Sequence, residues 1–490
     1  MQQNGSNVAV ATDDPLPNGI SADTGRPLPS LDALASLPDR VAAQGQATPA
    51  VRNKLETFGT PEGIDPEDLS QAGWGVVFAC SVDAAPLKEA LAPLLKLRQE
   101  QAGTFYAIFE GDRGVRPSED VLDWLARQGA NGGGGPGLQP VDPANGVPYY
   151  LLLVASPSQV PMEFQYMLDL YWAVGRVHFD GTEELARYAA SVVAYETADK
   201  PPQRRKQATV FATAHPFDAA TQMFTDAVAR PFTEGLGGQK PVADGTYFAM
   251  DAVLGASATK ACLAEVLRGN REGGVPALLF SGTHGMVFHE DDARLAACQG
   301  ALVCQDWPRY GSIDDTCWFA GADVPADAQL QGMIHFMFAC YSGGWSKLDS
   351  FRDGPNGMAK QVAPEPGIAR LPQALLAHPN GGALAVVAHI DRAWAFSFRT
   401  VNNSTQNTGM RDVVRRLLFG KRVGSATDAF NMQWAALAVP LADALRDPCA
   451  DPAVALRLAR LWIARDDARN YAILGDPAVR LRVEDMVAGS

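Results

Sequence analysis

The sequence predicts an α/β fold in which mostly parallel strands form a sheet with helices on its faces. Two observations support this prediction. Short, continuous apolar runs recur along the chain, as expected of strands buried in a parallel sheet. Between them lie longer segments whose apolar residues repeat at helical spacing. This alternation is typical of three-layer α/β/α units, and a chain of 490 residues is long enough for two in tandem.

The first unit is expected to begin near Gly73, after a loosely attached or disordered tail over residues 1–50. The run Trp74-Gly-Val-Val-Phe-Ala-Cys80 predicts a buried strand. Ser118 is the predicted N-cap of a helix over 118–127, because acidic residues follow it in the first turn. The other elements predicted here are helices over 85–101 and 183–196 and strands over 105–110 and 149–155.

The second unit repeats the alternation and closes with long helical patterns. We divide the chain into a first subdomain over 51–240 and a second subdomain over 241–490, with the split somewhere between residues 197 and 245. The strands predicted in this part of the chain are 208–212, 276–281, 333–339 and 382–388. The predicted helices are 218–235, 256–268, 409–419, 425–446 and 452–468.

Charge and cysteine content exclude several classes of protein. A net charge of −14 argues against broad nucleic-acid binding, and the densest basic cluster, residues 204–206, is expected to be a solvated turn. No stretch approaches the roughly eighteen apolar residues of a membrane span, and the first residues lack the pattern of a secretory signal. Seven cysteines, an odd and sparse set, are expected to be reduced thiols in a cytoplasmic protein.

Two motifs are rejected. Residues 132–137 match GxGxxG, but they follow a predicted helix and precede a Pro-rich loop, so no helix N-terminus would meet a phosphate. P-loop, HExxH and GxSxG motifs are absent. A metal set could be drawn from four residues, but its spacing differs from the usual zinc patterns, and we expect neither metal nor cofactor. Those four residues are His284, His289, Cys298 and Cys304.

Two strand ends carry the candidate chemistry. The apolar strand over 276–281 leads directly to His284 and Gly285, and the strand over 333–339 leads to Cys340, which is followed by Gly343 and Gly344. Ligands of α/β sheets bind beyond the carboxyl ends of strands, so both side chains would face one crevice. An imidazole can activate a thiol as a nucleophile. The N–H groups of Gly285 and Cys340 would form an oxyanion hole.

Other interpretations of these residues remain open. A single cysteine at a strand end is more often a small buried apolar residue, and a single histidine is more often structural. His335 and His389 compete for the histidine role. However, His335 lies inside the strand that leads to Cys340, and His389 lacks a following glycine.

The chain resembles a known family at these and other positions. Ser281-Gly-Thr-His284-Gly285 and Ala339-Cys340-Tyr-Ser-Gly343 resemble the His-Gly and Ala-Cys-x-Ser/Thr-Gly motifs of caspase-fold cysteine peptidases. Three further segments are similar to gingipain-like members of that group, and the resemblance spans roughly residues 145 to 482. The segments are Ala173-Val-Gly-Arg-Val177 with Glu184-Leu185, Val192-Val-Ala-Tyr-Glu196, and Asn470-Tyr-Ala-Ile-Leu-Gly-Asp-Pro-Ala-Val-Arg-Leu481.

The resemblance implies two caspase-like subdomains with a catalytic dyad in the second. It implies that Cys340 is the nucleophile of a cysteine endopeptidase, which forms a thioester acyl-enzyme. It also implies that His284 protonates the leaving amine and then activates water. Peptide or protein substrates, and an activator protein or autoprocessing, follow as expected partners. Gingipains are typically exported. We do not expect export of this chain, because no secretory signal peptide is recognised in its sequence.

The resemblance also directs attention to the loop after the strand over 382–388. If Asp391 points into the specificity pocket, cleavage after Lys or Arg follows; if Arg392 does, cleavage after Asp or Glu follows. Trp394 would form a wall in either case, and the alternative is that Asp391 and Arg392 pair with each other at the surface. We hypothesise a preference for basic residues. Further pocket candidates are Asp306, Asp314, Asp315 and Asp323.

Two other functions compete with the peptidase. The chain could be a catalytically silent or activator-dependent caspase-like module that serves as a protein-binding platform. It could also be a non-peptidase hydrolase that uses Cys340, but the order of His before Cys disfavours an α/β hydrolase. The loop over 305–332 is expected to be a lid or a site of autoprocessing.

Overall fold

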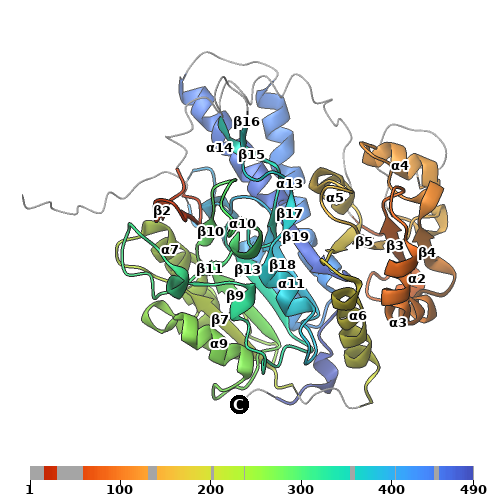
Figure 1. The fold of residues 1–490 in the computed structure, drawn as a ribbon, viewed down its shortest axis with the longest axis horizontal. Coiled ribbons are helices and arrows are strands. Elements are labelled where there is room, and N and C mark those ends of the chain that lie inside the picture. The colour runs from red at the N-terminus through yellow and green to blue at the C-terminus, as the bar shows by residue number, and fades with distance from the viewer. Residues whose placement is uncertain are drawn as a thin grey trace, which may run out of the picture.

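The structure is a computed structural model that describes residues 16–29, 59–130, 141–199, 204–236, 238–353, 359–402, 404–445 and 452–488. Its centre is a ten-stranded sheet with the strand order β4-β3-β5-β6-β19-β18-β13-β9-β7-β8 (Figure 1). The strands are β3 (Trp74–Phe78), β4 (Tyr106–Phe109), β5 (Tyr150–Val154), β6 (Ala173–Val177), β7 (Gln207–Ala212), β8 (Ala249–Leu254), β9 (Leu278–Gly282), β13 (Ile334–Phe338), β18 (Ala385–His389) and β19 (Tyr471–Gly475).

The sheet consists of two blocks that run in opposite directions. All neighbouring strands of the main sheet pair in parallel except β18 and β19, which are antiparallel. The first block is therefore β4-β3-β5-β6-β19, and the second block is β18-β13-β9-β7-β8. Their carboxyl ends lie at opposite edges of the sheet, so the strand ends that carry reactive groups in one block do not meet those of the other.

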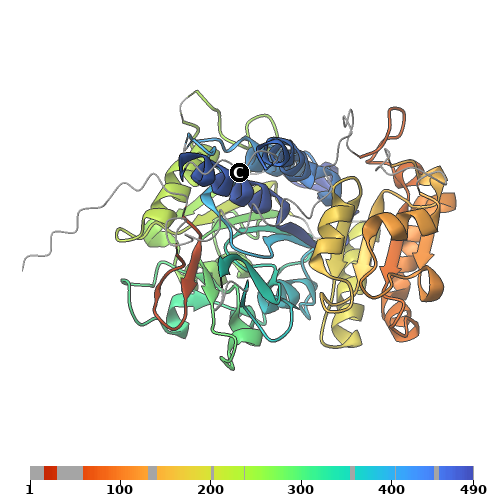
Figure 2. The same cartoon turned by 90° about the horizontal axis from the view of Figure 1, so that it is seen from above.

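Helices cover both faces of the sheet, and Figures 1 and 2 show the two blocks side by side. Helix α13 contacts β6 and β19 of the first block, while α11 contacts β18 of the second. The helices are α2 (Leu69–Ala72), α3 (Ala85–Ala102), α4 (Val121–Gln128), α5 (Met162–Asp169), α6 (Thr182–Thr197), α7 (Ala219–Phe224), α8 (Arg230–Thr233), α9 (Lys260–Arg268), α10 (Leu295–Cys298), α11 (Arg370–Leu376), α12 (Thr408–Leu418), α13 (Val423–Ala444) and α14 (Pro452–Arg469).

The predicted fold class, α/β with mostly parallel strands, is confirmed, and the two units share one sheet. The strands and long helices predicted from periodicity are present, whereas β6, β8 and β19 were not assigned as strands. The predicted N-cap of α4 is wrong. Asp120 caps this helix by accepting the N–H of Leu122 (2.7 Å), while Ser118 lies in a turn with φ of 58°. Strand β7, from within residues 51–240, pairs with β8 and β9 of the second block.

A buried ionic network ties the end of β19 to the rest of the first block. Asp476, directly after β19, accepts the indole N–H of Trp74 (2.9 Å) and the Nε–H of Arg98 (2.7 Å). The guanidinium of Arg98 also donates to both oxygens of Glu196 (2.6 and 2.7 Å). Arg98 and Asp476 are fully buried, and removing one member would leave the other charge without compensation. The attachment of β19 to the first block is therefore expected to be rigid.

The N-terminal tail prediction is wrong for residues 16–29. Strands β1 (Gly19–Ser21) and β2 (Arg26–Pro27) extend a small sheet whose other strands are β10 (Gly285–Val287), β11 (Leu302–Val303) and β12 (Trp318–Phe319). Ile20 is completely buried, so this segment packs as part of the second block. Figures 1 and 2 show it in red against that half of the molecule. The rest of the predicted tail lies outside the described residues.

Two short hairpin-like pairings complete the second block. They are β14 (Gly344–Trp345) with β17 (Gly367–Ile368), and β15 (Leu348–Asp353) with β16 (Ala359–Gln361).

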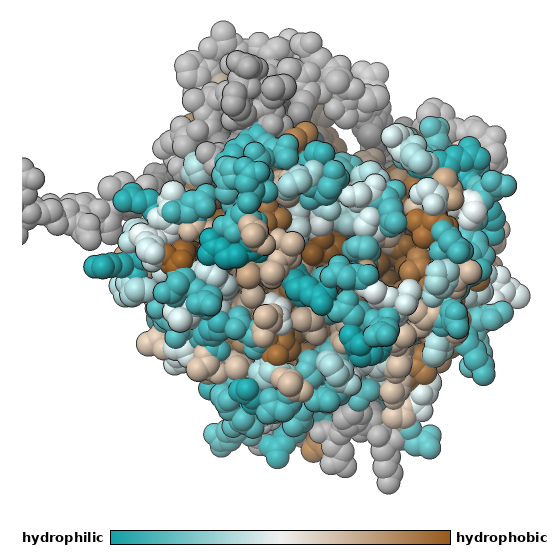
Figure 3. Space-filling model, viewed as in Figure 1, coloured by the Kyte–Doolittle hydropathy of each residue, from teal (hydrophilic) through white to brown (hydrophobic). Residues whose placement is uncertain are grey.

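The face seen in Figure 3 is mostly hydrophilic, with hydrophobic residues visible in small areas between hydrophilic ones. No helix within the described part of the chain combines the length and apolar character needed to cross a membrane.

Candidate active site

Two neighbouring strands bring His284 and Cys340 to one edge of the sheet. Strands β9 and β13 pair in parallel, with Gly282 opposite Phe338 at their ends. Each reactive residue follows its strand end closely, and the N–H of Thr283 donates to the carbonyl of Phe338 (3.1 Å). The two side chains that the sequence singled out therefore lie beyond adjacent strand ends, and both are fully buried.

A third strand supplies a carboxylate that the sequence analysis did not identify. Strand β7 lies beside β9, and Asp218 follows it as the N-cap of α7. Its Oδ2 lies 2.9 Å from Nε2 of His284 and accepts the N–H and hydroxyl of Thr221 (2.9 and 2.8 Å). Tyr310 donates its hydroxyl to Oδ1 (3.0 Å). Consecutive strands thus deliver an acid, a histidine and a thiol. The sequence did carry a signal for this residue, because Asp218 opens a predicted helix shortly after a predicted strand.

The contact with Asp218 fixes which nitrogen of His284 faces the crevice. Burial alone would raise the pKa of the Asp218 carboxyl, but the charge and hydrogen bond of His284 hold it well below its usual range. Within the described residues, Nδ1 of His284 has no hydrogen-bond partner although it is buried. Because Nε2 faces an ionised carboxylate, Nδ1 is the atom left to exchange a proton with a substrate.

Aromatic side chains form the wall behind His284. The ring of Trp307 packs edge-on against His284 and His215, with centroid separations of 6.1 and 5.1 Å. Nε2 of His215 lies 3.1 Å from the carbonyl oxygen of Cys304. Burial, followed by the charge of His284, lowers the pKa of His215 to about 4, so it stays neutral near pH 7. The 305–332 loop therefore contributes packing around the histidine through Trp307.

The Cys340 thiol sits at the start of a turn that is anchored to the loop after β18. Its Sγ accepts the N–H of Ala393 (3.2 Å), and Tyr341 donates its N–H to the carbonyl of Asp391 (2.9 Å). Tyr341 has a φ of 57°, which places a non-glycine residue in the left-handed region directly after the thiol. Burial raises the pKa of the Cys340 thiol, so it is protonated in this closed arrangement.

The predicted oxyanion donors point at a single oxygen. The N–H groups of Gly285 and Cys340 both donate to the carbonyl oxygen of Asn18, at 2.9 and 3.0 Å. Glycine is required at position 285, because a Cβ there would lie 1.9 Å from the carbonyl oxygen of Cys340. A peptide carbonyl thus occupies the position expected for the reacting group of a substrate. Asn18 had been assigned to the tail, and its role had no signal in the sequence.

The two competing histidines have structural partners. Nε2 of His335 lies 2.9 Å from the hydroxyl of Ser281, and burial lowers the pKa of His335 to about 3. Nε2 of His389 lies 3.1 Å from a carboxylate oxygen of Asp467, in a pair that is fully buried. Both rings are engaged within the core, away from the converging N–H groups.

The specificity candidates after β18 are buried rather than paired at the surface. Asp391 accepts the N–H of Arg392 (2.7 Å), and burial followed by the nearby Asp349 raises the pKa of the Asp391 carboxyl to about 6. The guanidinium of Arg392 forms its ion pair with Asp349. Trp394 is fully buried and forms an antiparallel bridge with Pro17. Of the three candidates, Trp394 lies beside the segment that fills the crevice.

The other candidate acids stabilise the 305–332 loop. Asp306 accepts the N–H of Lys260 (2.6 Å), and Asp323 pairs with its ammonium (2.8 Å). Asp314 caps the short helical turn that contains Asp315. The four considered metal ligands are not brought together. In the described part of the chain, the group close enough to hold an ion is an exposed acidic turn, composed of His289, Glu290 and Asp291.

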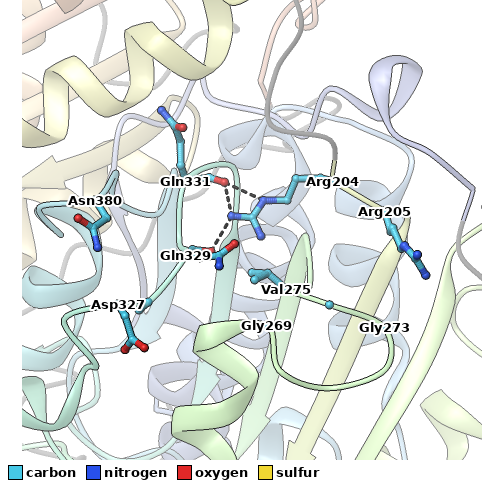
Figure 4. A pocket seen from close by; sticks show the side chains of 11 residues that line it. Arg204, Arg205, Gly269, Gly273, Val275, Asp327, Gln329, Gln331 and Asn380 are labelled. Carbon is cyan, nitrogen blue, oxygen red and sulfur yellow. Dashed lines mark hydrogen bonds between the residues drawn. The ribbon is translucent and has the colours of Figure 1, made fainter.

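A separate hollow lies at the opposite edge of the second block (Figure 4). Its lining residues precede strands β7, β9, β13 and β18, so it opens at the amino ends of these strands. The guanidinium of Arg204 donates across it to the carbonyls of Gln329 and Gln331, as the dashed lines in Figure 4 show. These contacts are structural, and the reactive residues lie at the other edge.

Comparisons with known proteins give distant likenesses. No family model and no curated protein matches the chain. It is similar to the Arg-specific cysteine proteinase gingipain R, at 14% identity over 87% of this chain and 81% of that chain, with a TM-score of 0.47. A solved structure of a protease gives 13% identity over 83% of this chain and 78% of that one, with a TM-score of 0.45. Saccharomyces cerevisiae separase, solved with securin, gives 10% identity over 91% of this chain and 27% of that chain, with a TM-score of 0.33.

Proposed function

We propose that this chain is a cysteine endopeptidase in which Cys340 is the nucleophile and His284 is the general acid and base. One observation carries the proposal. Two backbone N–H groups, of Gly285 and Cys340, converge on the carbonyl oxygen of one peptide unit that lies against the thiol side chain. Donors aimed at one oxygen are what the tetrahedral intermediate of acyl transfer requires.

The reaction begins when the sulfur of Cys340 attacks the carbonyl carbon and the oxygen gains negative charge between the two N–H groups. The thiol proton is transferred, through Nδ1 of His284, to the amine that leaves as the C–N bond breaks. A thioester remains on Cys340. Water, deprotonated by His284, then hydrolyses the thioester, which releases a carboxylic acid and restores the thiol. Asp218 touches no reacting atom, and its role is to position His284.

The hypothesis of cleavage after basic residues depends on Asp391. Its carboxylate accepts the N–H of Arg392, and no described contact joins that carboxylate to the segment in the crevice. A basic side chain would therefore have to draw Asp391 away from its own loop. The residue in that segment whose carbonyl meets the oxyanion donors is instead the uncharged Asn18.

The peptidase proposal is tested with an unfolded protein substrate such as casein. The purified chain should produce fragments, whereas Cys340→Ala should reduce their rate of formation by about 10⁴-fold or more, as expected for the loss of a nucleophile. Cys298→Ala is a matched control, because that thiol lies outside the crevice and should be dispensable. Equal fragmentation by the chain and by Cys340→Ala would overturn the proposal.

A second candidate function is an activator-dependent module that binds other proteins. It is favoured by one observation, namely that Cys340 and His284 have no exposed surface while the N-terminal segment occupies the crevice. A thiol-directed acyloxymethyl ketone would discriminate. Labelling of Cys340 only after a partner protein is added would favour this candidate, and labelling of the chain alone would favour the peptidase. A cytoplasmic location stays a prediction.

A further inference from the structure

The segment Leu16–Leu28 lies in the crevice in the manner of an extended substrate. Before the Asn18 carbonyl, the chain pairs antiparallel with the loop after β18. The N–H of Asn18 donates to the carbonyl of Ala393 (2.8 Å), and the N–H of Ala395 donates to the carbonyl of Leu16 (3.2 Å). This pairing holds two residues on the acyl side of one peptide bond at a fixed register.

After that carbonyl the segment changes partner. Gly19, Ile20 and Ser21 pair in parallel with β10, and the N–H of Ala22 donates to the carbonyl of Val287 (2.7 Å). The change of partner falls at the Asn18–Gly19 bond. The residues before this bond are therefore held by the loop after β18, and those after it by β10. The bond itself lies between these two pairings, beside Cys340.

Close packing at Gly19 supports the same register. A Cβ built on Gly19 would lie 2.9 Å from the sulfur of Cys340 and 2.8 Å from a terminal methyl carbon of Leu28. The thiol therefore lies directly against the residue that would carry the leaving amine. Any larger residue at this position would have to displace the segment or the nucleophile.

The side chain of Asn18 is bound through the nitrogen of its amide, while its Oδ1 has no hydrogen-bond partner among the described residues. Asn18 is 1% exposed, and its Nδ2 donates to the backbone carbonyl of Thr283 (3.4 Å). An aspartate of the same shape has no N–H to donate, and its carboxylate would face that carbonyl oxygen. A lysine or arginine could donate, but its longer side chain does not fit a space that asparagine already fills.

We propose that Cys340 cleaves the Asn18–Gly19 bond of its own chain and that the enzyme selects asparagine on the acyl side of the bond it cleaves. This inference rests on the proposed peptidase function. Attack by the sulfur breaks the bond between the Asn18 carbonyl carbon and the Gly19 nitrogen, and that nitrogen leaves as an amine with a proton from His284. Water then releases a peptide that ends in Asn18 and restores the thiol of the remaining chain.

The same tripeptide elsewhere in the chain provides an internal control. Pro17-Asn18-Gly19 occurs twice more in the sequence, as Pro355-Asn356-Gly357, which lies outside the described residues, and as Pro379-Asn380-Gly381. The last of these lies at the opposite edge of the sheet, and its Asn380 lines the hollow in Figure 4. There the amide of Asn380 donates to the carbonyl of Ala326 (2.7 Å). Cleavage by the enzyme should spare this site in the folded chain, whereas spontaneous chemistry of Asn–Gly pairs would not depend on Cys340.

The test follows the full-length chain by intact mass spectrometry after purification. We expect complementary products 1–18 and 19–490 from the native chain, no such products from Cys340→Ala, and at least tenfold slower cleavage of Asn18→Asp. No cut should occur at Asn380–Gly381. An uncut native chain, or equal cleavage in Cys340→Ala, overturns the self-cleavage inference.

A second arm separates selectivity from self-cleavage. The processed protein is given fluorogenic peptides that end in Leu-Pro-Asn, Leu-Pro-Asp or Leu-Pro-Arg. Release from the Asn peptide at least tenfold faster than from the other two supports the assigned selectivity, and faster release from the Arg peptide overturns it. Thiol-dependent cleavage of casein without any Asn preference would leave the peptidase standing and remove only this inference. No thiol-dependent cleavage of any substrate would remove both.

Discussion

The two edges of the second block differ in a way that supports the proposed location of the active site. At the amino ends of its strands lies an open hollow, crossed by Arg204 and lined by Asn380 of a Pro-Asn-Gly sequence. At the carboxyl ends the crevice is filled by another Pro-Asn-Gly sequence, whose Asn18 carbonyl accepts two N–H groups beside Cys340. Neither the hollow nor the tripeptide determines reactivity. Reactivity depends instead on two converging N–H donors beside a thiol. No open crevice is seen at this edge, because residues of the N-terminal segment already occupy it.

The largest expected effect comes from removing the charge that positions His284. Asp218→Asn should keep the fold of the α7 cap but lose the preferred orientation and tautomer of the imidazole, and kcat for a peptide substrate should fall by about 10²- to 10⁴-fold. Steady-state kinetics with the processed enzyme would measure this, and KM should change little because no substrate contact is removed. If kcat stayed within threefold of the native value, Asp218 would not be a positioning residue.

A buried carboxylate of the other block is the matched control. Asp169 is buried and accepts the N–H of Val174 (2.9 Å), far from the crevice along the sheet. Burial raises the pKa of the Asp169 carboxyl to about 8, so it is largely neutral at pH 7 and its replacement by asparagine is mild. Asp169→Asn should leave kcat unchanged.

The next effect concerns access to the thiol. Gly19→Ala places a methyl group against the sulfur of Cys340 and should push the segment out of the crevice. Alkylation of Cys340 by iodoacetamide, followed by mass spectrometry, should then be at least about tenfold faster, since the thiol regains water and its ordinary acidity. Gly181→Ala is the control, because a Cβ there meets nothing within 4 Å. Both changes are made in the slowly cleaved Asn18→Asp chain and labelled before cleavage, since loss of residues 1–18 would expose the thiol in either variant. Equal rates in both variants would mean that the segment does not restrict the thiol.

The pH dependence of labelling in the Asn18→Asp chain, measured before its slow cleavage proceeds, follows from the raised pKa of Cys340. The closed state holds the thiol proton more tightly than the open state, in which the thiol has an ordinary pKa near 8.5. Below about pH 8 both states are protonated and the preference for closure is unaffected. Above that value each pH unit should shift the balance toward the open state by up to about tenfold. The labelling rate of an exposed thiol rises with pH because more of it is thiolate, and the Gly19→Ala chain measures this ordinary rise. A steeper rise in the Asn18→Asp chain would show that the segment opens at high pH.

The sequence predicted which side chains lie together at the strand ends, but it did not predict the segment that fills the crevice beside them. His284, Gly285 and Cys340 were identified because an apolar strand that ends in a reactive side chain and glycine is a local pattern. Asp218 was missed because its role depends on β7 lying beside β9, which is a property of strand order. Asn18 was missed because low-complexity composition predicts a tail, while the pairing that orders it is made with residues more than 250 positions away.

The same reasoning explains why the sequence left two alternatives for the loop after β18. Asp391 and Arg392 were expected either in the pocket or paired at the surface, and both alternatives treat the loop as exposed. Burial instead pairs Arg392 with Asp349, which comes from β15. Which buried carboxylate meets a guanidinium depends on tertiary packing, and adjacent sequence positions do not reveal it.

A smaller effect is expected from the hydroxyl that supports Asp218. Tyr310→Phe removes one hydrogen bond to the carboxylate, but water can reach this half-exposed site and replace much of it. We expect kcat to fall by about threefold to tenfold, with the remaining contacts to Thr221 and His284 still fixing Asp218. Phe217→Leu, which alters the neighbouring aromatic packing without touching the carboxylate, is a suitable control. A loss as large as that of Asp218→Asn would show that the hydroxyl acts directly on substrate.

The opposite edge should affect stability and leave catalysis unchanged. Arg204→Ala leaves the carbonyls of Gln329 and Gln331 without their donor in a part-buried place, so the free energy of unfolding should fall by about 1 to 2 kcal/mol. Urea unfolding would measure this, with Arg457→Ala on the exposed side of α14 as a control expected to change it by less than about 0.5 kcal/mol. Because the strands of the second block connect this edge to the crevice only through their rigid backbones, kcat of the folded variant should stay native. A lowered kcat in a folded Arg204→Ala enzyme would mean that the hollow belongs to the active site after all.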